Sequence, residues 1–226
     1  MPRIHYAKSS EFPFHISARS NNRDWFDVPM NYCYGIFIKV FEKCIEKFEV
    51  KIHAFVLMDN HFHLIASTPR NNVSEFMHFL MSESSRGIRR KSSRINHIYG
   101  GRHRRTLITR AEYFAHCLKY VYRNPVKAGI CKNVEDHKFS TVSSEASKMK
   151  MLISPIDGGM SEFVPDSHTT LIDWLNEPTD IELDKMCTQS LKRSVCEFKQ
   201  VRNHRKPFRL DQGLLPTPHP KKVQCT

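Results

Sequence analysis

Two histidines placed two residues apart are the first feature of this sequence that could do chemistry. His61 and His63 lie in the β-rich run HFHLIAST, so as strand residues they would project from one face with Cα atoms roughly 6.5 Å apart. At that spacing both rings could bind one metal ion, provided that the imidazoles are neutral. The alternative interpretation of the same spacing is a pair of structural histidines that bind nothing.

A tyrosine and an asparagine four residues apart form the second candidate pair. In a helix, Tyr120 and Asn124 share one face at the edge of an apolar stripe. The tyrosine hydroxyl could then point across a sheet toward the histidines. The Asn124 amide oxygen could complete the shell of a hard divalent ion such as Mg²⁺ or Mn²⁺. The alternative for Tyr120 is an aromatic ring that only packs. The alternative for Asn124 is a residue at the helix end, because Pro125 disfavours the α conformation at the residue before it.

These side chains need a sheet and a helix to bring them together, and the hydrophobic periodicity predicts both. Alternation and β-rich composition predict strands at residues 12–19, 51–58, 61–68 and 105–109. Apolar residues at three- and four-residue spacing predict helices at residues 28–48, 73 to about 94, and 112–122. The order β-α-β-β-α-β-α is typical of a ferredoxin-like α+β sandwich with an antiparallel sheet.

The charge of the chain favours a polyanionic partner. Its 226 residues include 35 Lys and Arg against 23 Asp and Glu, which gives a formal net charge of +12. Residues 86–110 hold nine basic residues and no acidic one, a pattern typical of a surface that tracks nucleic-acid phosphates. A merely solvated basic face is the alternative.

The composition excludes several other classes of protein. With 40% hydrophobic and 11% aromatic residues, the chain can bury a core, which excludes a wholly disordered or collagenous protein. No apolar run approaches the roughly 18 residues of a membrane-spanning helix, and the first residues lack the apolar core of a signal peptide. The seven cysteines are scattered and never spaced as CxxC, so reduced thiols are expected. We therefore expect a cytoplasmic protein with no membrane partner.

A change in charge divides the chain near residue 145. Residues 1–145 contain the expected sandwich, and residues 146–226 form a C-terminal extension. Within the extension, residues 161–184 hold seven acidic residues and no basic one, whereas residues 192–222 are basic and end in a Pro-rich segment. The second stretch predicts a partly disordered tail.

Three segments resemble the IS200-like transposase family of HUH single-stranded DNA nucleases. They are HAFVLMDNHFHLIAST at 53–68, HIYGGRHRRTLI at 97–108 and YVYRNPVKAGI at 120–130. Within that family they look most like the tyrosine transposases associated with bacterial repetitive extragenic palindromes (REP elements). One departure is Asp59, which stands where the family's turn usually has proline.

The resemblance implies a bacterial transposase that uses His61, His63 and Asn124 to hold Mg²⁺ or Mn²⁺. Tyr120 would be the nucleophile that cleaves single-stranded DNA, forms a 5′-phosphotyrosine intermediate and lets the strands be rejoined. Because metal binding needs neutral histidines, we expect activity to fall below roughly pH 6. The protein would act as a monomer or a homodimer. A catalytically inactive, domesticated relative that only recognises palindromic DNA is the alternative function.

The same resemblance gives the basic residues a partner, namely hairpin DNA and the single strand beside it. The expected DNA-binding residues are Arg19, Asn22, Arg86, Arg89, Arg90, Lys91, Arg94, Arg102, Arg104 and Arg105.

Overall fold

The computed structural model describes residues 7–156 and 158–198. Its strands and longer helices follow the expected order. They are β1 (Phe14–Arg19), α1 (Met30–Phe48), β2 (Lys51–Met58), β3 (His61–Ser67), α2 (Val73–Arg89), β4 (Arg104–Leu107) and α3 (Ala111–Lys127). Three shorter α-helices follow: α4 (Ser147–Lys150), α5 (His168–Asn176) and α6 (Ile181–Ser190). The predicted α+β ferredoxin-like order is confirmed.

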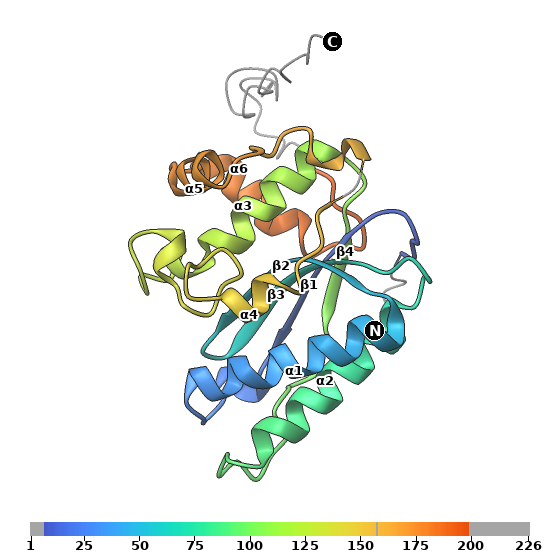
Figure 1. Cartoon of the computed structure of the whole chain (residues 1–226), viewed down its shortest axis with the longest axis vertical. Coiled ribbons are helices and arrows are strands. Elements are labelled where there is room, and N and C mark those ends of the chain that lie inside the picture. The colour runs from blue at the N-terminus through green and yellow to red at the C-terminus, as the bar shows by residue number, and fades with distance from the viewer. Residues whose placement is uncertain (1–6, 157, 199–226) are drawn as a thin grey trace.

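The four strands form one antiparallel sheet in the order β2-β3-β1-β4, with the two central strands β3 and β1 side by side (Figure 1). This order places strands that are distant in sequence next to each other. In the register of that central pair, Ser17 lies opposite His63 and Arg19 lies opposite His61. The polar residues of β1 therefore share a sheet face with the two histidines.

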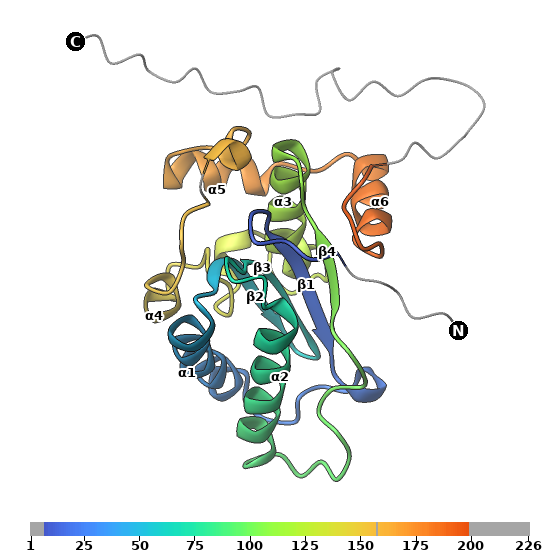
Figure 2. The ribbon, with the colours of Figure 1, turned by 90° about the vertical axis from the view of Figure 1, so that its right-hand side faces the viewer.

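Helices cover both faces of the sheet. Helices α1 and α2 pack side by side on one face, and α3 lies across the other (Figures 1 and 2). In β3, Phe62 and Leu64 point into the core under α1 and α2, whereas Ile65 points into the core under α3. The predicted alternation of this strand is confirmed, and the histidines lie on the α3 face.

Aromatic packing fixes the first core. The ring of Phe55 on β2 lies 5.0 Å from that of Phe41 and 5.1 Å from that of Phe37, both on α1. All three rings are fully buried. Such large side chains at fixed rotamers hold helix and sheet at one distance, so the strand that carries the histidines has a defined position.

Two helices end at places that differ from the sequence expectation. Helix α2 stops at Arg89, because Ser92 and Ser93 beyond it hydrogen-bond the carboxylate of Asp27 instead of continuing the helix. Helix α3 continues through Pro125 and ends at Lys127; two residues later the chain turns away at Gly129, whose φ of +71° is readily adopted by glycine. Pro125 is buried, so tertiary packing outweighs the local cost of a proline inside the helix.

Residues 146–198, the described part of the expected extension, share both hydrophobic cores with the first 145 residues. Ser154 donates from its backbone nitrogen to the Ile52 oxygen of β2 at 2.7 Å. At the opposite edge of the sheet, Val195 forms a parallel bridge to Leu107 of β4. Most of the predicted basic tail lies in residues 199–226, outside the described residues. Among the described helices, none has the length and apolar character needed to cross a membrane.

Candidate active site

The four residues expected to do chemistry line one cavity on the α3 face of the sheet. The cavity has a volume of about 730 Å³ and is bounded by β1, β3, α3, α6 and the loop before β4. Its lining includes His61, His63, Tyr120 and Asn124. Fold topology therefore joins residues that are about 60 positions apart in the sequence.

The two histidines converge as the strand spacing predicts. Their ring centroids lie 5.1 Å apart with the rings nearly perpendicular. His61 Nδ1 donates to the Asn60 side-chain oxygen at 2.7 Å, and His63 Nδ1 is hydrogen-bonded to His15 Nε2 at 2.9 Å. Since Nδ1 is engaged in both rings, Nε2 is the nitrogen that each histidine has available for a metal ion.

His15 is a residue of this site that the sequence analysis did not single out. It lies on β1, is 3% exposed, and stacks on His63 with ring centroids 5.2 Å apart. Burial lowers the pKa of His15 to about 3 and that of His61 to about 4, and it lowers the pKa of His63 well below its usual value. The three imidazoles are therefore neutral at physiological pH, the form in which histidine binds metal.

Tyr120 contacts two of these histidines, His63 and His15. Its ring centroid is 5.7 Å from that of His63 and 6.1 Å from that of His15, in edge-to-face contact with both. Burial raises the pKa of the Tyr120 hydroxyl to about 12, and a hydrogen bond from Thr188 of α6 opposes that shift in part. The hydroxyl is thus a neutral phenol at pH 7, and it must lose its proton when it attacks an electrophile.

Asn124 lies one helical turn after Tyr120, beside the same cavity. Its side-chain nitrogen donates to the Tyr120 backbone oxygen at 2.7 Å, which leaves the amide oxygen as a free acceptor. Two imidazole nitrogens and one amide oxygen are ligand atoms that suit a divalent metal ion. They leave other coordination positions of the ion for water or phosphate oxygens. Within the described residues, no group of three or more His, Cys, Asp or Glu side chains could form a closed metal site.

Four of the expected DNA-binding residues surround this cavity. Arg19 and Asn22 come from the end of β1 and the turn after it, Arg102 comes from the loop before β4, and Arg104 is the first residue of β4. All four side chains are exposed. The neighbouring Arg105 points to the opposite sheet face, where it is buried and donates to the Ser74 hydroxyl of α2 at 2.9 Å. Strand alternation thus separates two adjacent arginines.

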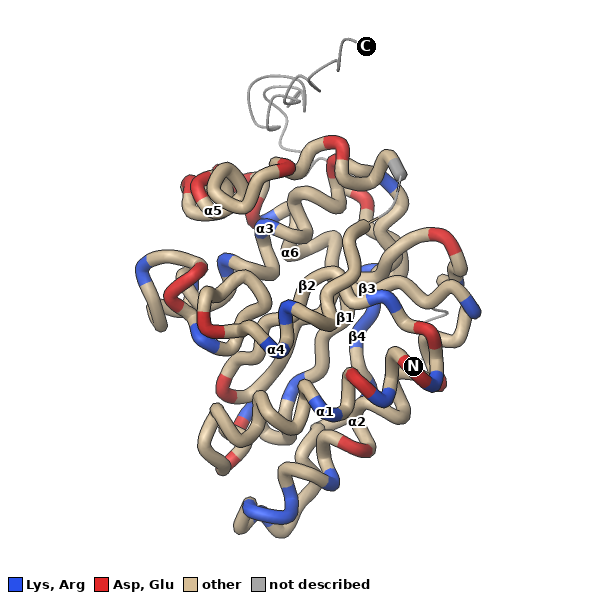
Figure 3. The backbone as a smooth tube through the Cα atoms, viewed as in Figure 1, with Lys and Arg blue, Asp and Glu red and all other residues tan. Residues whose placement is uncertain are grey.

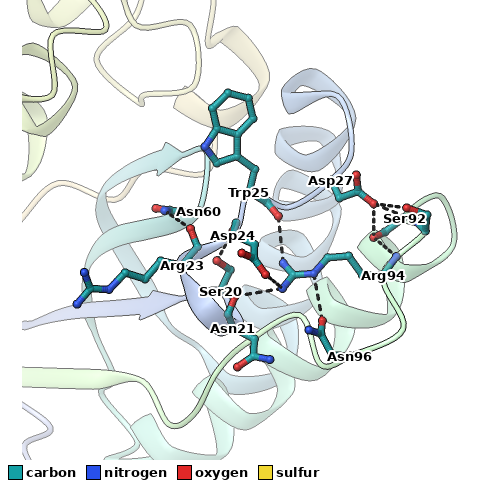
Figure 4. A network of polar contacts seen from close by, with 11 residues as sticks. Ser20, Asn21, Arg23, Asp24, Trp25, Asp27, Asn60, Ser92, Arg94 and Asn96 are labelled. Carbon is teal, nitrogen blue, oxygen red and sulfur yellow. Dashed lines mark hydrogen bonds and ion pairs between the residues drawn. The ribbon is translucent and has the colours of Figure 1, made fainter.

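The remaining expected residues lie away from the cavity. Lys and Arg gather at the far end of α2 and in the loop after it (Figure 3). Arg86, Arg89, Arg90 and Lys91 are exposed there. Arg94 differs from them, because its guanidinium is the centre of a hydrogen-bond network (Figure 4). It donates to the backbone oxygens of Trp25 and Asn21 and to the Asp24 carboxylate. Its side chain is 9% exposed and holds the loop after β1 in place.

Residues of the C-terminal extension also line the cavity, which the sequence did not predict. Thr188 of α6, with Leu191 and Lys192 just after it, lines the cavity. Helix α6 is also tied to α3 by an ion pair between Asp184 and Lys127, and the Lys127 ammonium lies 4.7 Å from the centre of the Tyr120 ring. The surroundings of Tyr120 therefore depend on residues that follow the expected sandwich.

Comparisons with known proteins show the fold and the family of this chain. A solved structure described as a REP-associated tyrosine transposase bound to a REP hairpin is similar in fold, with a TM-score of 0.53 and 22% sequence identity. The alignment covers 70% of this chain and 90% of that one. A search of curated proteins found no match. The model of the family described as "Transposase IS200 like" matches residues 10–124, just over half of the 226-residue chain. This chain therefore belongs to the IS200-like transposase family.

Proposed function

We propose that this transposase cleaves and rejoins single-stranded DNA through a covalent bond to Tyr120. The observation that carries the proposal is the position of the Tyr120 ring against His63, in a cavity that His61 and exposed arginines also line. A hydroxyl beside neutral imidazoles in a basic cavity suits attack on a phosphodiester.

The proposed step conserves bond energy. The Tyr120 oxygen forms a bond to phosphorus while the bond from phosphorus to the 3′ oxygen breaks, and overall one proton passes from the phenol to the released 3′-hydroxyl. The product is a 5′-phosphotyrosine. Because a phenolate is a good leaving group, the 3′-hydroxyl of another strand can reverse the step and rejoin DNA without ATP.

His61 and His63 would hold a divalent cation, Mg²⁺ or Mn²⁺, through their Nε2 atoms, with the Asn124 amide oxygen beside them. When bound, such an ion supplies polarisation of the scissile phosphate. The hydrogen bonds that His61 and His63 make to Asn60 and His15 orient the two rings before any ion arrives.

The basic residues divide into two proposed roles. Arg19, Asn22, Arg102 and Arg104 would contact the phosphates of the strand in the cavity, since they are exposed and line it. The exposed cluster formed by Arg86, Arg89, Arg90 and Lys91 would contact a DNA hairpin, as the ligand of the similar solved structure suggests. We assign Arg94 and Arg105 to holding the fold, because both are engaged inside the protein.

The experiment is covalent capture on labelled DNA. The protein is incubated with end-labelled oligonucleotides from palindromes that flank its own gene, with Mg²⁺ or Mn²⁺, and resolved on a denaturing protein gel. We expect a covalent band that is absent with EDTA and in Tyr120→Phe. The matched control is Tyr122→Phe, since Tyr122 is buried on the same helix and bonds Thr141 instead of lining the cavity. Binding without a covalent band would favour the non-catalytic alternative.

A further inference from the structure

Trp25 is a large aromatic side chain that the proposed chemistry does not use, and it is 71% exposed. It lies in the loop that joins β1 to α1, next to the turn whose residues line the active-site cavity. We propose that Trp25 is a stacking platform for one unpaired DNA base of the strand that leaves that cavity. This inference rests on the proposed function, because it extends the path of the single strand.

The exposure of Trp25 is built into the fold. Its backbone oxygen accepts from Arg94 at 3.0 Å, while the next residue, Phe26, is buried and donates from its backbone nitrogen to the Asp59 backbone oxygen at 2.9 Å. The indole projects away from the network around Arg94 (Figure 4). Because the backbone is held in this way, only the two side-chain torsions of the indole need to be ordered when a base stacks on it.

Hydrogen bonds connect the loop that carries Trp25 to the active site. Ser20 donates from its backbone nitrogen to the Asn60 oxygen at 2.8 Å, and the Asn60 side chain donates to the Arg23 oxygen at 2.7 Å. Asn60 directly precedes His61, and Arg23 lines the active-site cavity two residues before Trp25. In the proposed path, a strand that leaves the cavity past Arg23 would run toward the indole.

The surroundings of Trp25 suit a base better than a phosphate. A second cavity of about 330 Å³ lies beside the indole. Its lining includes the apolar residues Val28 and Met30. It also includes three acidic residues, Asp24, Asp27 and Asp59, and one basic residue, Arg94, which is paired with Asp24. Carboxylates repel phosphate but accept hydrogen bonds from exocyclic amino groups, which adenine, cytosine and guanine carry and thymine lacks. The site should therefore take a base with an amino group, stacked on the indole.

Fluorescence tests the platform directly, because the chain has two tryptophans and the other, Trp174, is 8% exposed. In Trp174→Phe, Trp25 is the sole tryptophan emitter. This variant is titrated in EDTA with a palindromic hairpin that carries a single-stranded adenine tail, with the same hairpin without a tail, and with an abasic tail. We expect the adenine tail to quench the emission and the other two DNAs to leave it nearly unchanged.

Affinity measurements supply the second arm. Trp25→Leu should weaken binding of the adenine-tailed hairpin roughly 10-fold, within the range of base–aromatic stacking, and leave binding of the tail-less hairpin unchanged. Ile95→Ala is the matched control, because Ile95 is 97% exposed and lies outside both cavities. Equal affinity of Trp25→Leu and the parent for the tailed hairpin would overturn the platform while leaving covalent capture by Tyr120 intact. Failure of the parent to bind any hairpin would overturn both proposals together.

Discussion

Replacing His15 by phenylalanine should weaken metal binding without touching a metal ligand. His15 supplies the hydrogen-bond partner of His63 Nδ1, at 2.9 Å. For His63 to bind an ion through Nε2, its proton must lie on Nδ1, where His15 Nε2 accepts it. In His15→Phe that N–H would be buried without an acceptor, because His63 is 7% exposed.

The size of the effect follows from the cost of a buried, unpaired donor. That cost is about 1–3 kcal/mol, which corresponds to roughly 5- to 150-fold in the dissociation constant of the metal. The metal-free protein avoids the cost by moving the proton to Nε2, where solvent in the cavity can accept it. The penalty therefore falls on the metal-bound form.

Titration calorimetry with Mn²⁺ alone measures this constant without any DNA. We expect His15→Phe to bind Mn²⁺ roughly 10- to 100-fold more weakly and His15→Gln, whose amide oxygen can accept from Nδ1, to recover most of the affinity. His53→Phe is the control, because His53 is also buried but bonds Ser67 and Ser154 away from the cavity. Unchanged Mn²⁺ affinity in a folded His15→Phe protein, or an equal loss in His15→Gln, would refute the reasoning.

Three further outcomes follow from the site. Because burial lowers the pKa of His61 to about 4, its ring stays neutral in mild acid, so Mn²⁺ affinity should hold to about pH 5.5 and fall only below about pH 5, which is lower than the roughly pH 6 expected from the sequence; a fall centred near pH 6.5 in a calorimetric pH series would contradict this. Arg94→Ala should lower the free energy of unfolding in urea by about 1–2 kcal/mol, since it removes the hydrogen bonds that hold the loop after β1, and an unchanged value would argue against its structural role. Arg102→Ala should leave unfolding unchanged but reduce the slope of log affinity for DNA against log salt by about 1, and an unaltered slope would remove Arg102 from the phosphate contacts.

Strand periodicity made half of the site predictable from sequence. In HFHLIAST the alternation of polar and apolar residues placed His61 and His63 on one face and Phe62 on the other, as the structure has them. Helical spacing likewise placed Tyr120 beside Asn124. What spacing could not supply was the rotation of α3 over the sheet, which depends on packing between distant residues.

The contact between His15 and His63 could not be predicted from the sequence. The two residues are 48 positions apart, and the contact exists only because β1 lies next to β3 in the sheet. A signal was present nonetheless, since His15, Ser17 and Arg19 are polar at alternate positions of an otherwise apolar strand. Polar residues on the inner face of a strand mark a site more often than a core.

The positions of the arginine side chains were also not predictable from the sequence. A run of positive charge predicts a basic surface but cannot tell which side chains reach it. Arg104 and Arg105 are adjacent, yet one lines the cavity and the other is buried against α2. Arg94 looked like part of the same surface, but its guanidinium is used by the loop after β1.

The measurement that tests the central claim most directly is identification of the amino acid that carries DNA. The covalent complex is digested with nuclease and protease, and the peptide that retains a nucleotide is sequenced by mass spectrometry. We predict a single adduct on Tyr120 linked through a 5′-phosphate. An adduct on Tyr113 or Tyr122, or DNA that is cut while every tyrosine peptide stays unmodified, would contradict the account.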